Sequence, residues 1–273
     1  MSSIVQQITE SVAFIRNKCK GETAVGIILG SGLGNLVHEI ETEWEIPYSE
    51  IPHFPVSTVQ GHHGRLIFGR LGGKPVWVMA GRFHYYEGYS AQQVSYPVRV
   101  LRLLGVKTLL LTNAAGGVNP HFSIGDLMVI QDHISFFTQN PLIGKNEEEL
   151  GTRFPDMSEP YSKALISKVE SIAAEHNIPL QKGVYTGVTG PTFETRAEYK
   201  LIHLLGGDAV GMSTVQETIA AVHAGMAVFA MSVITDIGIR EEENTITHEE
   251  VLQAAKAAEP KLTLLFTEMI KSL

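Results

Sequence analysis

Short apolar runs alternate with longer amphipathic stretches along the chain of 273 residues. The short runs predict buried strands, and apolar residues that recur every three or four positions predict helices. The predicted strands are residues 24–29, 65–71, 75–80, 107–112, 126–130, 182–188 and 227–234. The predicted helices are residues 4–18, 91–104, 162–176, 196–205, 215–224 and 249–271. Strands that alternate with helices predict an α/β protein with a central mixed β-sheet flanked by helices.

Four of the helices begin with a capping-box pattern, in which a Ser or Thr is followed three residues later by Gln or Glu. The four pairs are Ser90 with Gln93, Thr195 with Glu198, Thr214 with Glu217, and Thr247 with Glu250. No linker, repeat or low-complexity stretch divides the chain, and the polar loop at 140–160 is too short to be a domain. We therefore expect one domain over residues 1–273.

Composition narrows the class of protein. The net charge is −8 and no Lys- or Arg-rich cluster occurs, which argues against nucleic acid and anionic membranes as partners. Cys19 is the single cysteine, so the chain has no internal disulfide framework and no thiolate metal cluster. The first 14 residues lack the basic start of a signal peptide, and no apolar run reaches the roughly 18 residues that a membrane span needs. We expect a soluble, cytoplasmic protein.

Arg82 and His84 directly follow the predicted strand 75–80. An arginine there can hold a carboxylate or a phosphate through two parallel hydrogen bonds. His84 adds an imidazole that titrates near neutral pH. The alternative is a surface loop with an ordinary salt bridge.

Three small-residue segments also sit at strand ends or before a helix: GSGLG at 30–34, NAAGG at 113–117 and GMS at 211–213. Such turns bring backbone N–H groups close to an anion, and Ser31 and Ser213 add hydroxyls. A dinucleotide fingerprint is not complete, because Asn35 replaces its third glycine. The alternatives are a tight turn, close strand–helix packing and a helix cap. One phosphate site formed by all three segments and Arg82 is the most economical interpretation.

The segment GPTFETR at 190–196 suits a flat heterocycle. Phe193 offers a stacking surface, and Glu194 offers an acceptor for ring N–H groups. Val210 and Met212 can complete an apolar wall, and Asp236 follows strand 227–234, where α/β proteins often place functional groups. Alternatively, Glu194 complements a helix dipole and Asp236 caps a turn.

Taken together and in this order, these motifs resemble those of the trimeric purine nucleoside phosphorylases, with GH at 61–62 and VGMST at 210–214 as further matches. The resemblance runs from about residue 24 to the C-terminal helix. It implies that phosphate attacks C1′ of a purine nucleoside and releases the free base and α-ribose 1-phosphate, as in purine salvage. Inorganic phosphate is then a co-substrate, and no cofactor or metal is needed. The adjacent His62 and His63 lack further ligands at metal-site spacing.

The resemblance also implies a role for each matching residue. The phosphate would be held by Ser31, His62, Arg82, His84, the backbone N–H of Ala114, and Ser213. The ribose would be held by Tyr86, Met212 and His248, the last at its 5′-hydroxyl. The base would be surrounded by Phe193, Glu194, Val210 and Asp236. Phe154 resembles the residue that this family lends to a neighbouring subunit's site, which implies a homotrimer.

The chemistry explains these residue types. Cleavage of the N-glycosidic bond leaves positive charge on the sugar and negative charge on the departing purine, so the enzyme must position phosphate and stabilise the base. Arg82 would supply a permanent charge and His84 a tunable donor. Glu194 would accept from N1–H of hypoxanthine or guanine, and a group at position 236 would bond N7.

One departure concerns Asp236, since family members that prefer 6-oxopurines usually carry asparagine there. An ionised Asp236 would repel O6 and accept from a 6-amino group, whereas Glu194 favours a 6-oxopurine. A protonated Asp236 that donates to N7 reconciles the two. We therefore expect inosine and guanosine as substrates. One alternative is a methylthioadenosine or adenosine-type phosphorylase. A methylthioadenosine phosphorylase would want an apolar 5′ pocket, whereas His248 suggests a polar one. The other is a non-catalytic purine- or dinucleotide-binding module.

Overall fold

A computed structural model describes residues 3–56, 64–238 and 246–273 of the chain. Its helices are α1 (Ile4–Lys18), α2 (Ala91–Leu103), α3 (Lys163–Glu175), α4 (Arg196–Leu204), α5 (Val215–His223) and α6 (His248–Lys271). Its strands are β1 (Val25–Ile28), β2 (Glu41–Pro47), β3 (Arg65–Leu71), β4 (Lys74–Ala80), β5 (Thr108–Gly117), β6 (Leu127–Ile134), β7 (Gln181–Gly187), β8 (Ala209–Gly211) and β9 (Ala227–Ile237).

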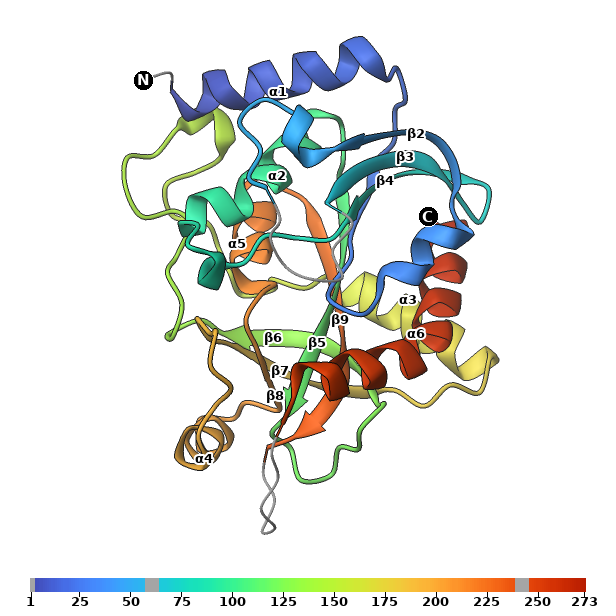
Figure 1. Ribbon diagram of the computed structural model, residues 1–273, viewed down its shortest axis with the longest axis vertical. Coiled ribbons are helices and arrows are strands. Elements are labelled where there is room, and N and C mark those ends of the chain that lie inside the picture. The colour runs from blue at the N-terminus through green and yellow to red at the C-terminus, as the bar shows by residue number, and fades with distance from the viewer. Residues whose placement is uncertain (1–2, 57–63, 239–245) are drawn as a thin grey trace.

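The strands form one mixed sheet in the order β2-β3-β4-β1-β5-β8-β7-β6-β9 (Figure 1). Strand β1 runs parallel to β4 and β5, and β9 runs parallel to β5 along nearly its whole length. Because β9 also pairs with β6, the strands β5, β8, β7, β6 and β9 close into a ring. Closure removes exposed edges from this half of the sheet and holds its strands in a fixed arrangement.

The helices pack in two groups beside the sheet. Helices α1, α2 and α5 contact one another in turn, while α3 and α6 pack together and against β9 (Figure 1). Helix α6 is 24 residues long and buries Leu262, Leu265 and Phe266 in the main core. In the ranges that the structure describes, no helix combines the length and the apolar character required to cross a membrane.

The predicted α/β architecture with a mixed sheet flanked by helices is confirmed. The hydrophobic pattern did not predict two of the strands, β2 and β8. Strand β2 exposes most of its side chains at the sheet edge, and β8 has only three residues. The prediction of a turn at 113–117 was wrong, because β5 continues to Gly117. Gly116 and Gly117 there pair with β8 on one side and β9 on the other.

Three predicted capping boxes form with both of their hydrogen bonds, at Ser90, Thr195 and Thr247. The fourth prediction was wrong. Thr214 has no side-chain capping bond, and its φ of 71° lies in the left-handed region. Glu217, the expected partner of Thr214, points elsewhere, to Arg82.

Candidate active site

One cavity collects the side chains that the sequence assigned to phosphate, ribose and base. It is lined by Ser31, Arg82, His84, Tyr86, Ala114, Phe193, Glu194, Val210, Met212, Ser213, Asp236 and His248. These residues come from the ends of β1, β4, β5, β8 and β9, from the segment before α4, and from the start of α6. His62 lies outside the described residues. Phe154 lies elsewhere, with 86% of its surface exposed.

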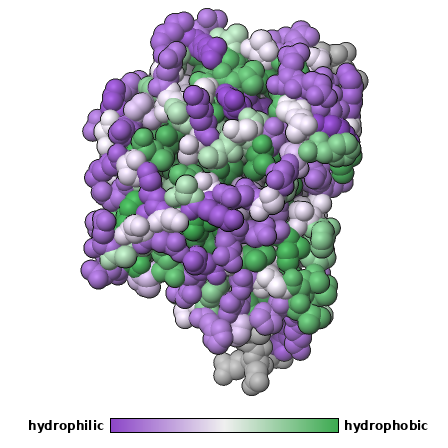
Figure 2. Space-filling view, turned by 180° about the vertical axis from the view of Figure 1, so that it is seen from behind, coloured by the Kyte–Doolittle hydropathy of each residue, from purple (hydrophilic) through white to green (hydrophobic). Residues whose placement is uncertain are grey.

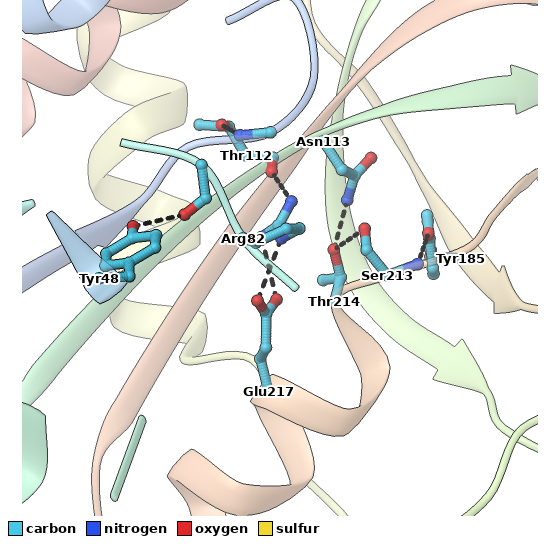
Figure 3. Close-up of polar contacts among 10 residues, drawn as sticks. Tyr48, Arg82, Thr112, Asn113, Tyr185, Ser213, Thr214 and Glu217 are labelled. Carbon is cyan, nitrogen blue, oxygen red and sulfur yellow. Dashed lines mark hydrogen bonds and ion pairs between the residues drawn. The ribbon is translucent and has the colours of Figure 1, made fainter. Parts of the chain in front are cut away.

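Arg82 is buried and held by a buried carboxylate (Figure 3). Its Nε donates to Oε1 of Glu217 at 3.0 Å, and its Nη2 donates to Oε2 at 2.9 Å. Its Nη1 donates to the backbone oxygen of Thr112. The permanent charge expected of Arg82 is therefore paired with a carboxylate inside the protein. The pair brings a rigid, correctly oriented guanidinium to the cavity, and Glu217 matches its charge.

The backbone before α5 presents Ser213 to the same end of the cavity. Thr214 is β-branched, and a φ of 71° is rare for such a residue. Nδ2 of Asn113 donates to Oγ1 of Thr214 at 2.9 Å and holds this conformation (Figure 3). The backbone N–H of Ser213 donates to the hydroxyl of Tyr185 at 3.3 Å. Because α5 begins at Val215, Ser213 lies at the partly positive end of that helix, which favours an anion.

Gly30 allows the end of β1 to approach β5 and Arg82. A Cβ atom at Gly30 would lie 2.7 Å from the backbone oxygen of Thr112 and 3.2 Å from Nη1 of Arg82. Any larger residue would push the guanidinium away. This close approach accounts for the first glycine of the segment 30–34 and places the neighbouring Ser31 on the cavity wall.

His84 is oriented by Glu87. Oε1 of Glu87 accepts from the backbone N–H of His84 at 2.8 Å and lies 3.1 Å from its Nδ1. The ring stacks on Tyr86 with centroids 4.7 Å apart. Burial lowers the pKa of His84, although Glu87 opposes the shift, so the imidazole is neutral at pH 7. With its Nδ1–H directed at Glu87, the neutral ring presents Nε2 as an acceptor, which becomes a donor on protonation.

Two carboxyl groups occupy the other end of the cavity. Asp236 is buried, and its Oδ1 accepts from Oγ1 of Thr235 at 3.1 Å. Burial raises the pKa of Glu194, and the nearby Asp236 raises it further. Gly116 of β5 lies beside Asp236, since a Cβ atom there would be 3.0 Å from Oδ2 of Asp236. The charge of Asp236 therefore influences how Glu194 titrates.

Sequence reasoning missed three residues that shape the site. Glu217 was read as part of a cap, yet a carboxylate in the first turn of an otherwise apolar helix was a usable signal. Asn113 was treated as part of a turn. Tyr199, buried on α4 close to Glu194 and Asp236, gave no signal beyond its place on the apolar face of a helix.

Comparisons with known proteins identify the family of this chain. A sequence model of the phosphorylase superfamily matches residues 24–271. The chain is 50% identical over 267 residues to purine nucleoside phosphorylase 1 of Bacillus subtilis, which covers 98% of this chain and 97% of that protein. It is also similar to a crystal structure of Schistosoma mansoni purine nucleoside phosphorylase in complex with adenosine, with a TM-score of 0.93 and 40% identity over 98% of each chain.

A crystal structure of schistosoma purine nucleoside phosphorylase in complex with hypoxanthine likewise has a TM-score of 0.93, at 39% identity over 100% of this chain and 99% of that one. The matches extend over the whole fold, including every segment that lines the cavity. The chain therefore belongs to the phosphorylase superfamily, within which it is a member of the purine nucleoside phosphorylases.

Proposed function

We propose that the protein catalyses the phosphorolysis of purine ribonucleosides and deoxyribonucleosides, with inosine and guanosine preferred, to the free base and α-(deoxy)ribose 1-phosphate. The observation that carries this proposal is that one cavity is lined by Arg82 and Ser213 and also by two residues with carboxyl groups, Glu194 and Asp236. The sugar of a nucleoside would lie between them. Relatives that bind hypoxanthine and adenosine support the same substrate class.

The phosphate end would hold the nucleophile. Ser31, Arg82, Ala114 and Ser213 line the same cavity. The two hydroxyls, the backbone N–H of Ala114 and the guanidinium would hold the phosphate. Phosphate held there would lie under C1′ and would balance the positive charge that develops on the sugar. Tyr86, Met212 and His248 would hold the ribose. Burial raises the pKa of Tyr86 to about 12, so its hydroxyl remains a donor.

The base end would stabilise the leaving group. Glu194, when ionised, would accept from N1–H of a 6-oxopurine, while Phe193 and Val210 would contact its ring. Asp236, when protonated, would donate to N7 as negative charge builds there. Asp236 and Glu194 would thus act on the base, whereas His84 would act on the phosphate.

Two alternatives receive less support. A methylthioadenosine-type phosphorylase would want an apolar wall at the 5′ end, where His248 lines this cavity. An adenosine-type enzyme would face the carboxylate of Glu194 with the acceptor N1 of adenine. A non-catalytic purine-binding module would not need Arg82, His84 and Ser213 at one end of the cavity.

We also propose a homotrimer in which Phe154 enters the site of a neighbouring copy. Apolar residues interrupt the polar surface in several places (Figure 2). Phe154 lines a second hollow together with Ile143 and Arg153, and its neighbour Ile143 is 67% exposed. An aromatic side chain that is 86% exposed has a large apolar area to bury in such an assembly.

We propose that the protein is located in the cytoplasm. We also propose that it uses no cofactor, because bound phosphate would supply the nucleophile.

The test is incubation of the protein with inosine, with and without phosphate, while hypoxanthine and ribose 1-phosphate are measured. We expect both products in equal amounts and only with phosphate. Hypoxanthine together with free ribose, in the absence of phosphate, would indicate a hydrolase. Binding of inosine without either product would favour the non-catalytic module.

A further inference from the structure

The segment between β8 and α5 holds a strained threonine next to the phosphate end of the cavity. Thr214 is fully buried, and its φ of 71° is a conformation that β-branched residues rarely adopt. Ser213, the residue before it, lines the cavity, and α5 begins at the residue after it. Glycine would fit this backbone without strain, so the strained conformation points to a role for the threonine side chain.

The side chain of Thr214 forms two hydrogen bonds (Figure 3). Nδ2 of Asn113 donates to Oγ1 of Thr214 at 2.9 Å, and Oγ of Ser213 lies 3.1 Å from the same oxygen. All three residues are buried, and Asn113 and Ser213 line the cavity. The hydroxyl of Tyr185 accepts from the backbone N–H of Ser213 at 3.3 Å and fixes Ser213 from its other side.

The hydrogens in this chain of side chains can be counted. Oγ1 of Thr214 accepts a hydrogen from the Asn113 amide, and the Thr214 hydroxyl has one proton of its own. In the described ranges, the other side chain that bonds Oγ1 is Ser213, so the buried proton is satisfied only when Thr214 donates to Oγ of Ser213. The proton of the Ser213 hydroxyl is then left for an acceptor in the cavity.

We propose that Thr214 is a positioning residue that turns the Ser213 proton toward phosphate. Asn113 donates to Thr214, Thr214 donates to Ser213, and Ser213 donates to a phosphate oxygen. The proposal rests on the proposed function for the identity of the anion. It goes further by giving Asn113 and Thr214 a role and by giving each hydrogen bond between these side chains a direction.

The direction matters because a hydroxyl group can present either its proton or a lone pair to an anion. A proton attracts a phosphate oxygen, whereas a lone pair repels it. The three side chains make this choice before phosphate binds, so the hydroxyl does not have to be reoriented at binding. The unusual φ of Thr214 fits this role, because it keeps Oγ1 within reach of both Asn113 and Ser213.

The test removes the Thr214 hydroxyl in two ways. Thr214→Gly suits a φ of 71° and releases the strain, whereas Thr214→Val keeps the β-branched shape and the strain. Thr214→Ser keeps the hydroxyl and is the conservative variant. Thr218→Val is the matched control, because Thr218 is an equally buried threonine of α5 outside the cavity.

The measurements are the affinity for inorganic phosphate by calorimetry, the KM for phosphate and for inosine, and the unfolding temperature. We expect Thr214→Gly and Thr214→Val to bind phosphate about tenfold more weakly, which is the scale of one hydrogen bond. KM for phosphate should rise, and KM for inosine should not. Thr214→Ser should restore most of the phosphate affinity, and Thr218→Val should bind phosphate as wild type does. The Gly and Val variants should differ in unfolding temperature, so a loss of affinity that they share does not come from stability.

A double-mutant cycle tests whether Thr214 acts through Ser213. We expect Ser213→Ala alone to weaken phosphate binding, and Thr214→Gly to cause no further loss in the Ser213→Ala background. Losses that add in the double variant would mean that Thr214 acts on phosphate by another route, and the proposal would be wrong.

The sign of the change tests the direction of the hydrogen bonds. If Ser213 donated to Thr214 instead, removal of the Thr214 hydroxyl would free the Ser213 proton. Phosphate would then bind to Thr214→Gly and Thr214→Val as tightly as to wild type, or more tightly, which would overturn the proposal. An equal loss of phosphate affinity in Thr218→Val would also overturn it, because the effect would not be specific to Thr214.

Failure of the proposed function would look different. If wild type binds phosphate but releases no hypoxanthine from inosine, the proposed function fails, and the phosphate affinities still decide the role of Thr214. If wild type does not bind phosphate, both proposals fall.

Discussion

The two ends of the cavity are built differently. At the phosphate end, Arg82 is 1% exposed, donates two hydrogen bonds to Glu217, and lies against β1 and β5 in the sheet. At the base end, Phe193 is 40% exposed, and the polar groups are two neighbouring carboxyls. The charge at the first end is fixed by an ion pair, whereas the charge at the second depends on where a proton lies.

This difference matches what each end would have to recognise. Phosphate is the same in every turnover, so a rigid cradle in the core loses nothing by being inflexible. Purines differ in their donors and acceptors, and a change of protonation can alter which base is accepted. We expect mutations at the phosphate end to affect turnover of all nucleosides alike, and mutations at the base end to discriminate between them.

The largest effect should follow from Arg82→Ala. The change removes the guanidinium and leaves Glu217 as a buried charge without its partner, so we expect kcat/KM for phosphate to fall by roughly 10³-fold or more and the unfolding free energy by about 3–5 kcal/mol. Arg82→Lys retains a charge and should separate the two losses. Hypoxanthine affinity without phosphate should change little in any variant that stays folded. An equal loss of base binding in Arg82→Lys would break the comparison between the two ends.

Glu194→Gln should produce the next largest effect. The neutral amide replaces a charge-assisted bond to N1–H, and we expect about a 100-fold loss in kcat/KM for inosine. Adenosine turnover should change far less, and KM for phosphate should stay the same. Steady-state kinetics with each nucleoside would show this pattern. An equal loss in kcat/KM for inosine and adenosine would mean that Glu194 does not recognise N1 of the base.

Phe154→Ala tests whether one end of the site depends on a second copy of the chain. If Phe154 enters a neighbour's cavity beside the nucleoside, KM for inosine should rise about 5- to 10-fold through loss of an aromatic contact. KM for phosphate should not change. Light scattering should give three times the chain mass for the wild type and for Phe154→Ala. A monomeric wild type with full activity would contradict the shared site.

The smallest effect concerns stability and pH. Burial lowers the pKa of His84 below its ordinary value of 6.5, so the unfolded chain binds more protons just below that pH. Stability should therefore fall as the pH drops from 6.5 toward the lowered pKa, and then level off. We expect His84→Gln to lose less unfolding free energy than wild type on acidification, as measured by urea unfolding. Equal losses would show that other histidines with a lowered pKa, such as the half-buried His133, dominate.

The fold could be predicted where the pattern is local. Helix α1 and strand β3 have the bounds that their periodicity indicated, because each has one clearly apolar face or run. The ring closure could not be predicted, because it depends on β9 pairing with two distant strands at once. The small residues at 113–117 are typical of a turn, and only those long-range pairings make them a strand.

The site was predictable for residues that stand next to a strand end or a helix start, such as Arg82 after β4 and Glu194 before α4. It was not predictable where a local motif competed with a distant partner. The spacing of Thr214 and Glu217 fits a capping box, yet an ion pair between the buried Glu217 and Arg82 outweighs a helix cap. Tyr199 lies on a regular helical pattern, and its contact with the chain that leaves β9 could not be predicted, because β9 is distant in the sequence.

The most direct test of the account is the ratio of kcat/KM for inosine to that for adenosine, in wild type and in Asp236→Asn. The account holds that Asp236 is a protonated donor to N7, and an asparagine amide is also a donor. We therefore expect wild type to prefer inosine by at least about tenfold, and Asp236→Asn to retain that preference with less dependence on pH. A wild type that prefers adenosine, and an Asp236→Asn variant that reverses the preference, would contradict it.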